Sequence, residues 1–313
     1  MISKYPEKSW SFSKYKTLMK CPRAYYYSKF LMWGGWERTA SERSRKAYRL
    51  TKLTTIEQFL GALIHKYIAN NITALKIKDI KSAINYIGKE FNKAVYSSYK
   101  LRKEWELDPK NYTMFYSVYY KNRNLFEDKL GKEIKEKTNV LLNNYFNSNT
   151  LKDLQNGIKI IEIDKEKNYP SFFIRDYKIY SIVDLMYEKN NEIYIIDWKT
   201  GKKSSDDEFQ LKLYALYAYK NYNIDLNKIT LINEYLYEGT FEKRKYGKNE
   251  LLEVEKFIEE KITVMEEYLD DKEKNIPKSE AFFPAKTSKY NCKWCNFKEI
   301  CPEYSESFIN TNI

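Results

Sequence analysis

The four cysteines of this chain lie near its two ends, and their spacing constrains the fold more than any other feature. Three of them form CKWCNFKEIC, and one more stands far upstream: Cys292, Cys295, Cys301 and Cys21. Two thiolates separated by two residues can reach one metal centre, and a third nearby adds a ligand. Zinc and iron–sulfur centres both accept four thiolates. The pattern predicts a metal site that clasps residues 9–31 to residues 281–302, with buried free thiols as the alternative.

The charge balance favours a polyanionic partner. The 313 residues include 55 Lys and Arg against 43 Asp and Glu, which gives a net charge of +12. Such a chain favours nucleic acid first and an anionic membrane second, with simple solubility as the alternative. The sequence contains no run of about 18 apolar residues that would predict a transmembrane helix, and the N-terminus lacks an apolar signal core. We therefore expect a cytoplasmic protein with reduced thiols and no membrane partner.

Missing motifs exclude several enzyme classes. His65 is the only histidine, so a Ser-His-Asp or Cys-His hydrolase would have to use it. No GxSxG-type elbow is present to supply a serine nucleophile. The sequence also contains neither a Walker A motif nor GxGxxG, which removes the familiar nucleotide-binding loops.

The first half of the chain has the apolar spacing of helices. Thr54 and Glu57 predict a capping box before the helix IEQFLGALIHKYI, whose apolar residues recur every three or four positions. Two further helices are expected at about 79–96 and 111–146. The final helix is expected at 248–270, before a loop-rich tail that carries three of the cysteines.

The middle of the chain changes to the period of strands. Residues 158–237 contain short β-rich runs, a turn at 189–191, and one helix that begins with acidic residues. The runs are IKIIEI, SFFI, YKIYSIVDLMYE, EIYIID and ITLINEYLY, and the helix is DDEFQLKLYALYAYKN. This order predicts a single α/β domain over residues 1–313, with a mixed sheet core flanked by helices.

Two acids and a lysine fall on neighbouring predicted strands. Asp197 and Lys199 are two residues apart and share one face of their strand, while Asp184 ends or bends the strand before it. Buried acids are costly unless a cation accompanies them, and oxygen ligands suit Mg²⁺ or Mn²⁺. A lysine beside such an ion suits metal-assisted phosphodiester hydrolysis. The alternative is a surface ion pair between Asp197 and Lys199.

Three more residues could join this site. Gln210 and Tyr214 are spaced i, i+4, so they share a helix face that could point at the acids, although this spacing is more often ordinary helix surface. His65 lies beside the apolar stripe of its helix. A lone histidine there is usually a packed residue, and as neutral imidazole it could be a third metal ligand.

Taken in order, these motifs resemble a known family. The order is a Cys in SFSKYKTLMKCPRAYYY, a GxxxH helix from Gly61 to His65, Asp184, DWKTGK, QxxxY, and a CxxC with a third Cys ahead of Pro. It resembles the iron–sulfur-containing RecB-type nucleases of the PD-(D/E)XK superfamily. Relatives include the AddB nuclease domain, the CRISPR adaptation exonuclease and the exonuclease V group. The resemblance implies a restriction-endonuclease-like fold with a helical insertion at 66–150 and an iron–sulfur clasp.

The resemblance also implies a role for each residue. His65, Asp184 and Asp197 would ligate the Mg²⁺ or Mn²⁺ ion, with the Trp198 carbonyl, and Lys199 would be the catalytic lysine. Gln210 and Tyr214 would support the site, and relatives often carry an acid at the position of Glu162. The four cysteines would hold a [4Fe–4S] cluster: Cys21, Cys292, Cys295 and Cys301.

For this family we expect a metal-dependent DNA nuclease, acting as a single-stranded DNA exonuclease in CRISPR adaptation or in DNA repair and recombination. Protein partners in such a complex are expected. One basic run is the first choice for a phosphate track: Arg38, Arg43, Arg45, Lys46 and Arg49. Aromatic residues in CPRAYYYSKFLMWGGW could stack on bases, although most are expected to pack the clasp. The alternative function is a non-catalytic iron–sulfur or zinc protein that binds DNA as an adaptor.

Overall fold

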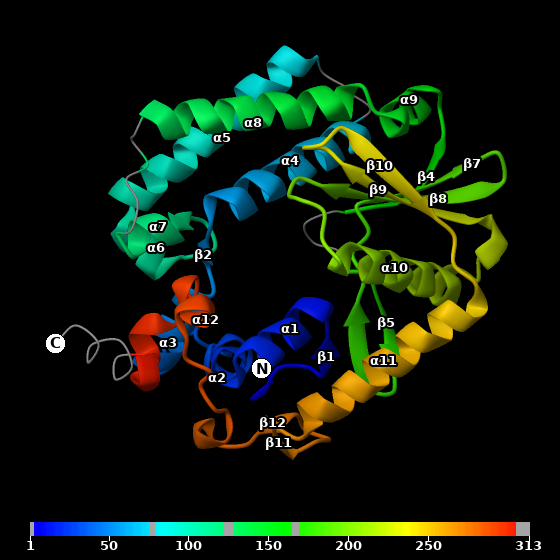
Figure 1. The fold of residues 1–313 in the computed structure, drawn as a ribbon. Coiled ribbons are helices and arrows are strands. Elements are labelled where there is room, and N and C mark those ends of the chain that lie inside the picture. The colour runs from blue at the N-terminus through cyan, green and yellow to red at the C-terminus, as the bar shows by residue number, and fades with distance from the viewer. Residues whose placement is uncertain (1–2, 75–78, 122–124, 126–127, 165–168, 305–313) are drawn as a thin grey trace.

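A mixed five-stranded sheet lies toward one side of the molecule, at the upper right of Figure 1. The computed structural model describes residues 3–74, 79–121, 125, 128–164 and 169–304. The strands are ordered β10-β9-β8-β7-β4, and only the central β8–β9 pair is parallel. Their bounds are β4 Lys159–Ile163, β7 Leu185–Lys189, β8 Glu192–Lys199, β9 Ile229–Tyr235 and β10 Thr240–Arg244. The predicted α/β fold with a mixed sheet is confirmed.

Local sequence explains the two connections at the centre of this sheet. The hairpin between β7 and β8 turns at Asn190 and Asn191, whose φ angles of 53° and 65° belong to the left-handed region that asparagine tolerates. The parallel pair needs a crossover, which is helix α10, Asp206–Tyr222. All seven residues of β9 are buried, as expected for a central strand that is covered on both faces.

One face of the sheet is covered by α10 and by α11, Lys248–Glu266. A smaller sheet joins this layer, with β1 of Ser9–Trp10 parallel to β6 of Tyr177–Tyr180 and β5 of Ser171–Ile174 at its edge. The sequence did not predict the short first strand. It brings the N-terminus onto the core, where helix α1, Phe12–Lys20, follows with Ser11 as its cap.

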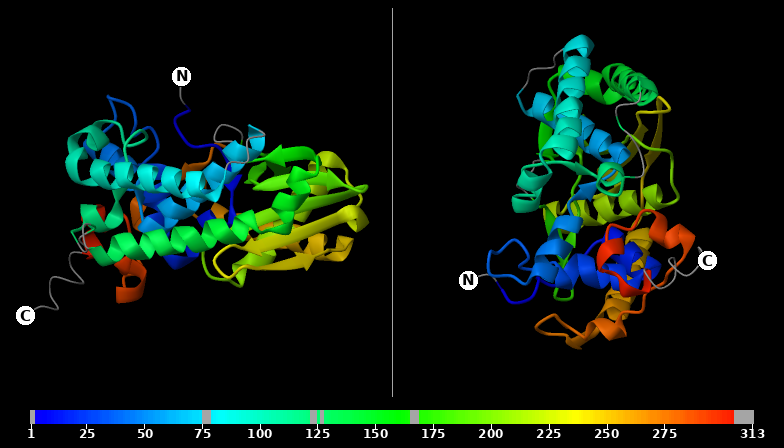
Figure 2. Two further views of the ribbon diagram at one scale, coloured as in Figure 1. Left: turned by 90° about the horizontal axis from the view of Figure 1, so that it is seen from above. Right: turned by 90° about the vertical axis from the view of Figure 1, so that its left-hand side faces the viewer.

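The other face is covered by a helical layer. Helix α4, Ile56–Thr73, contributes buried Leu60, Ile64 and Ile68 to the core that includes Ile196 and Trp198 of the sheet. Helices α5, Ile80–Lys100, and α8, Asp128–Phe146, lie side by side beyond it, as both views of Figure 2 show. Helix α9, Asn149–Gln155, leads back into the sheet. None of the described helices is long and apolar enough to span a membrane.

Two helical predictions were wrong in detail. The capping box is formed by Thr55 and Gln58 instead of Thr54 and Glu57, because the backbone of Thr54 pairs with Phe115 across strands β2, Leu53–Thr54, and β3, Met114–Phe115. That pairing also interrupts the single helix expected at 111–146. The structure has β3, then α7 of Tyr116–Tyr119, then α8, and residues 122–124 and 126–127 of the expected helix lie outside the described residues.

The two end segments of the chain lie against each other (Figure 1). Arg23 Nε donates to the Phe283 carbonyl at 2.8 Å, and the Tyr27 hydroxyl contacts Glu280 at 2.8 Å and the Ile300 carbonyl at 3.1 Å. The N-terminal elements are α2 Pro22–Tyr26, the π-helix η1 Tyr27–Leu31 and α3 Glu42–Leu50. The C-terminal elements are β11 Leu269–Asp271, β12 Ile276–Pro277, η3 Glu280–Phe282, α12 Lys289–Lys293 and η4 Lys298–Ile300.

Candidate active site

Asp184 and Asp197 meet on one face of the central sheet. Leu185 pairs with Ile196 across the antiparallel β7–β8 hairpin, so the next residues outward, Asp184 and Asp197, stand opposite each other. Asp184 is only 9% exposed and Asp197 only 3%. The Trp198 amide donates to Asp184 Oδ2 at 2.7 Å, which joins the two strands at the acids themselves.

Lys199 brings a positive charge to the same place. Its Nζ lies 2.7 Å from Asp197 Oδ2 and 3.6 Å from Asp207 Oδ1, and it donates to Gln210 Oε1. Burial opposes the charged form of this lysine, but the neighbouring carboxylates, led by Asp197, outweigh burial and raise its pKa. Lys199 therefore stays protonated against the acids.

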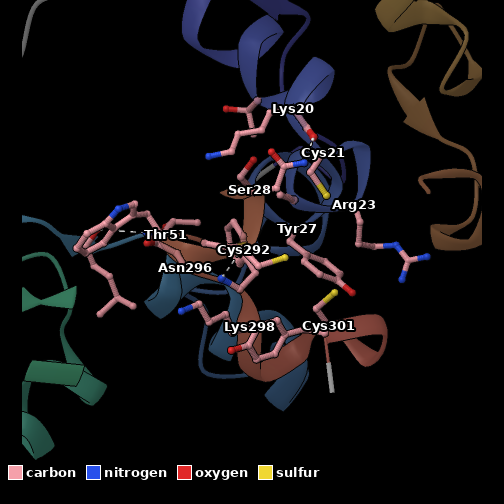
Figure 3. A pocket seen from close by; sticks show the side chains of 18 of the residues that line it. Lys20, Cys21, Arg23, Tyr27, Ser28, Thr51, Cys292, Asn296, Lys298 and Cys301 are labelled. Atoms are coloured by element: carbon pink, nitrogen blue, oxygen red, sulfur yellow. Dashed lines mark hydrogen bonds between the residues drawn. The ribbon is translucent and has the colours of Figure 1, made fainter. Parts of the chain in front are cut away.

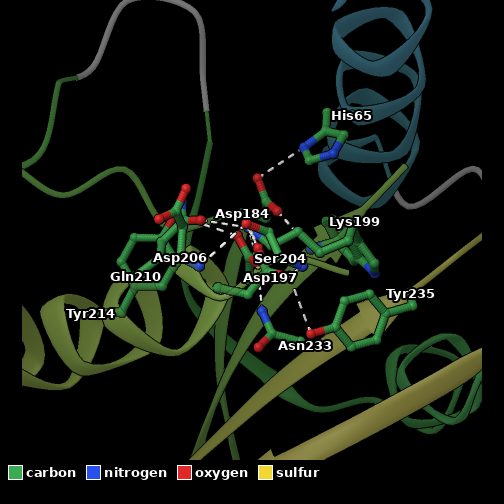
Figure 4. Close-up of polar contacts among 12 residues, drawn as sticks. His65, Asp184, Asp197, Lys199, Ser204, Asp206, Gln210, Tyr214, Asn233 and Tyr235 are labelled. Atoms are coloured by element: carbon green, nitrogen blue, oxygen red, sulfur yellow. Dashed lines mark hydrogen bonds and ion pairs between the residues drawn. The ribbon is translucent and has the colours of Figure 1, made fainter. Parts of the chain in front are cut away.

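Helix α10 presents Gln210 and Tyr214 to the acids on one face (Figure 4). Gln210 Nε2 contacts the Tyr214 hydroxyl at 2.6 Å, and that hydroxyl lies 3.5 Å from Asp197 Oδ1. The i, i+4 spacing read from the sequence thus places both side chains beside the acid–lysine pair. The connected side chains run from Lys199 through Gln210 and Tyr214 to Asp197.

Helix α4 adds His65 from the opposite side (Figure 4). His65 Nδ1 lies 3.0 Å from Asp184 Oδ1. Burial lowers the pKa of His65, but the Asp184 carboxylate and its hydrogen bond outweigh burial and raise the pKa to about 9. Gly61 allows this approach, because a Cβ at that position would lie 2.7 Å from Oγ1 of Thr200.

The electrostatics of the site follow from crowding two acids into a buried place. Burial raises the pKa of Asp197 to about 6, and the negative charge of Asp184 adds to the shift. The Lys199 ammonium and His65 oppose this shift only in part. A cation placed between the two carboxylates would relieve their repulsion.

Three residues near the acids were missed by sequence analysis. Asn233 of β9 lies beside Asp197 in the parallel register and donates through Nδ2 to Asp197 Oδ2 at 2.7 Å. Asp207 accepts from the Ser204 amide at 2.9 Å and contacts the Tyr235 hydroxyl at 3.2 Å. From the sequence, the helix dipole alone explained the presence of an acidic residue at this position. The third residue is Asp164, in the loop after β4, whose backbone amide donates to the Asp184 carbonyl.

Nearly the whole chain is similar to a known protein superfamily. The sequence profile of the PD-(D/E)XK nuclease superfamily matches residues 9–302. The chain belongs to the PD-(D/E)XK nuclease superfamily. Members are typically nucleases that hydrolyse phosphodiesters with divalent metals such as Mg²⁺ or Mn²⁺. No curated protein sequence matched the chain.

The donor set of this PD-(D/E)XK nuclease is chemically suited to Mg²⁺ or Mn²⁺. His65 could supply an imidazole nitrogen, and Asp184 and Asp197 could supply carboxylate oxygens, to such an ion. Asp197 Oδ2 is engaged by Lys199 and Asn233, which leaves Oδ1 with the more distant Tyr214. Across the described residues, no group of three His, Cys, Asp or Glu side chains is already arranged to hold an ion.

The four cysteines of the nuclease line one cavity of about 850 Å³ between the two end segments (Figure 3). All four are free thiols of intermediate exposure, and burial raises the pKa of Cys295 and of Cys301, the latter to about 11. Backbone amides of Lys286 and Phe297 donate to Cys21 and Cys295, each at 3.5 Å.

The remaining predicted residues lie elsewhere. In the basic run, Arg43 pairs with Glu280 at 2.7 Å and Lys46 pairs with Glu299 at 2.7 Å, so these two dock α3 onto the C-terminal segment. No ion pair is found for the other members within the described residues: Arg38, Arg45 and Arg49. Glu162 contacts the hydroxyls of two tyrosines of α10 rather than the acids: Tyr217 and Tyr222.

Proposed function

We propose that this chain is a metal-dependent single-stranded DNA exonuclease that acts in CRISPR adaptation or in DNA repair, together with protein partners. One observation carries the proposal. Asp184 and Asp197 stand opposite each other in a buried hairpin, with Lys199 on the same face. In a PD-(D/E)XK nuclease this arrangement supports phosphodiester hydrolysis at these residues.

In this proposal, His65, Asp184 and Asp197 hold the Mg²⁺ or Mn²⁺ ion, with the Trp198 carbonyl. When bound, the ion supplies Lewis-acid charge that stabilises the phosphate as negative charge develops on it. Lys199 keeps its ammonium beside the acids, where it orients the attacking water and stabilises the same negative charge.

Other side chains keep these groups in position. Asn233 and Tyr214 hold Asp197 from two sides, and Gln210 joins Tyr214 to Lys199. A group fixed by several partners loses little entropy when the substrate arrives, which is why such support raises rate. These residues are positioning residues rather than groups that touch the phosphate.

The shape of the helical layer favours a single strand threaded from an end. A cavity of about 1160 Å³ is lined by residues of α4 and α5, including His65, and by Thr200 beside Lys199. Substrate entering there would lie between α4 and α5 and would reach His65, which contacts Asp184. Passage between two helices suits one flexible strand with a free end, and this supports exonuclease action on single-stranded DNA.

The nuclease proposal is tested with end-labelled single- and double-stranded DNA, incubated with Mg²⁺ or Mn²⁺ and then with EDTA. Asp197→Asn and Lys199→Met are expected to lower cleavage by about 100-fold or more, since each removes charge that acts on the transition state. Shortening of labelled strands from one end would identify an exonuclease and its polarity.

The matched controls come from the same segment of chain. Lys203 is exposed and Asp206 is half-buried on the loop and first turn that follow Lys199, where they pair with Glu242 and Lys16. Asp206→Asn and Lys203→Met are expected to cleave as the natural chain does. Full activity in Lys199→Met would refute the assigned chemistry, and DNA binding without any turnover would favour the non-catalytic adaptor.

We also propose that Cys21, Cys292, Cys295 and Cys301 hold a [4Fe–4S] cluster. The support is that all four line one cavity and that backbone amides donate to two of the sulfur atoms. Anaerobic purification is expected to give a brown protein with about four iron atoms, and Cys21→Ser is expected to lose them. A colourless protein containing zinc would overturn the cluster and leave the nuclease proposal standing.

A further inference from the structure

The lining of the cysteine cavity carries basic side chains, of which Arg23 is paired with Glu280 and Glu303. Among the described residues that line it, five are Lys or Arg and none is Asp or Glu: Lys20, Arg23, Lys52, Lys286 and Lys298. Figure 3 shows Lys20 and Lys298 on opposite sides of the thiols. The cavity also extends past the cysteines to Thr55 and Gln58 at the start of α4. Its charge and length suit a polyanion that continues beyond the thiols.

Two aromatic side chains stand exposed at this end of the molecule. Tyr290 is 84% exposed on α12, and Trp294, which ends that helix and lines the cavity, is 52% exposed. They are spaced i, i+4 and each has a lysine ammonium 5.6 Å from its ring, Lys20 for Tyr290 and Lys293 for Trp294. Exposed rings beside lysines are the elements from which sequence-tolerant single-strand binding sites are built.

These rings differ from the aromatic residues that the sequence had offered for stacking. Tyr25 and Tyr27 of the CPRAYYYSKFLMWGGW stretch are buried in the core, where bases cannot reach them. Tyr290 and Trp294 come from the other end of the chain and remain accessible. No sequence pattern favours them over the other aromatic residues, because exposure depends on how the clasp packs.

The cysteine cavity and the cavity that reaches His65 share two lining residues. Gln58 and Ala62 of α4 line both, and the second cavity continues along α4 to His65 and Thr200. With a rise of 1.5 Å per residue, the helix carries this path about 10 Å from Gln58 to His65. A strand that lay on the exposed rings could therefore follow α4 to the candidate active site.

We infer that Tyr290 and Trp294 form a stacking platform at which single-stranded DNA enters, with the lysines of the cysteine cavity guiding its phosphates along α4 toward the acids. The inference rests on the proposed function for the choice of DNA as the polymer. It adds a binding site at the C-terminal segment, remote from Asp184 and Asp197 in sequence. The four thiols line the cavity itself, whereas Tyr290 lies outside its lining and Trp294 is half exposed, so the platform is distinct from the thiols.

The platform is tested by binding in EDTA, where no cleavage occurs. Fluorescence anisotropy of labelled oligodeoxythymidylate measures Kd for the anaerobically purified full chain. Tyr290→Ala and Trp294→Ala are each expected to weaken binding by about 5-fold or more, since losing one stacked base costs about 1–3 kcal/mol. Tyr290→Phe and Trp294→Phe keep a ring and are expected to bind nearly as the natural chain does.

Controls separate this inference from the proposed function. Phe173 on β5 is 63% exposed and lines neither cavity, so Phe173→Ala is expected to leave Kd unchanged. Circular dichroism and urea unfolding show whether each variant keeps its fold. Unchanged Kd in the folded alanine variants, or equal losses in the phenylalanine variants, overturns the platform. Because binding is read without metal, an inactive natural chain would refute the nuclease and leave this result interpretable.

Discussion

Two glycines in neighbouring helices allow a sharp test of how closely α4 approaches the candidate active site. At Gly61 in α4, an added Cβ would lie 2.7 Å from Oγ1 of Thr200, whereas at Gly88 in α5 it would meet nothing within 4 Å. Alanine is favoured over glycine in a helix by about 1 kcal/mol. Gly88→Ala is therefore expected to raise the free energy of unfolding by about 0.5–1 kcal/mol.

Gly61→Ala has the same helical gain but adds a steric conflict. Overpacking of this kind costs about 1–3 kcal/mol, so the net change is expected between neutral and a loss of about 2 kcal/mol. The conflict is relieved by movement of Thr200 or of α4, and movement of α4 carries His65 away from Asp184. Cleavage by Gly61→Ala is expected to fall by about tenfold, while cleavage by Gly88→Ala stays unchanged.

Urea unfolding and cleavage of labelled DNA measure both effects. The cause is isolated by Thr200→Ala, which removes the hydroxyl that meets the new methyl group. The Gly61→Ala/Thr200→Ala pair is expected to show a coupling energy of at least about 1 kcal/mol, with the double variant more stable than the single effects predict. If Gly61→Ala is as stabilising as Gly88→Ala and shows no coupling, the close approach does not exist.

Three further changes have expected outcomes. Asn233→Leu removes the amide that donates to Asp197 and is expected to lower the rate of cleavage by about tenfold, measured at saturating DNA. R23M leaves the partners of a buried guanidinium unpaired and is expected to cost about 3 kcal/mol in urea unfolding, whereas R43M at an exposed pair costs less than about 1 kcal/mol. Burial lowers the pKa of Lys29 to about 7, so above pH 7 the unfolded chain binds more protons than the folded chain and the free energy of unfolding rises with pH. K29M lacks this titration. In parallel urea titrations, the free energy of unfolding of K29M is therefore expected to fall relative to that of the natural chain by about 1 kcal/mol per pH unit above pH 7.

Much of the central fold could be predicted because its patterns are local. The period-two runs, the Asn190–Asn191 turn and the acidic start of α10 each specify an element without reference to the rest of the chain. The register of this hairpin places Asp184 opposite Asp197, so predicting the hairpin was enough to predict that the two acids lie close together.

The residues that were missed depend on contacts between distant segments. Asn233 reaches Asp197 only through the parallel register of β8 and β9, which no spacing along the chain reveals. The helix expected at 111–146 is interrupted because Phe115 pairs with Thr54, more than fifty positions upstream. Likewise, the charge of Arg43 looked available for phosphate until the fold brought Glu280 against it.

The joining of the two ends also determines when this protein can finish folding. Arg23 is synthesised about 260 residues before its partners Glu280 and Phe283, so it cannot form these contacts until the end of the chain has been made. At translation rates of about 5–20 residues per second, the first segment spends some 10–50 seconds without them. A ribosome that stopped before residue 280 would release a chain in which Arg23 and Tyr27 lack these C-terminal partners.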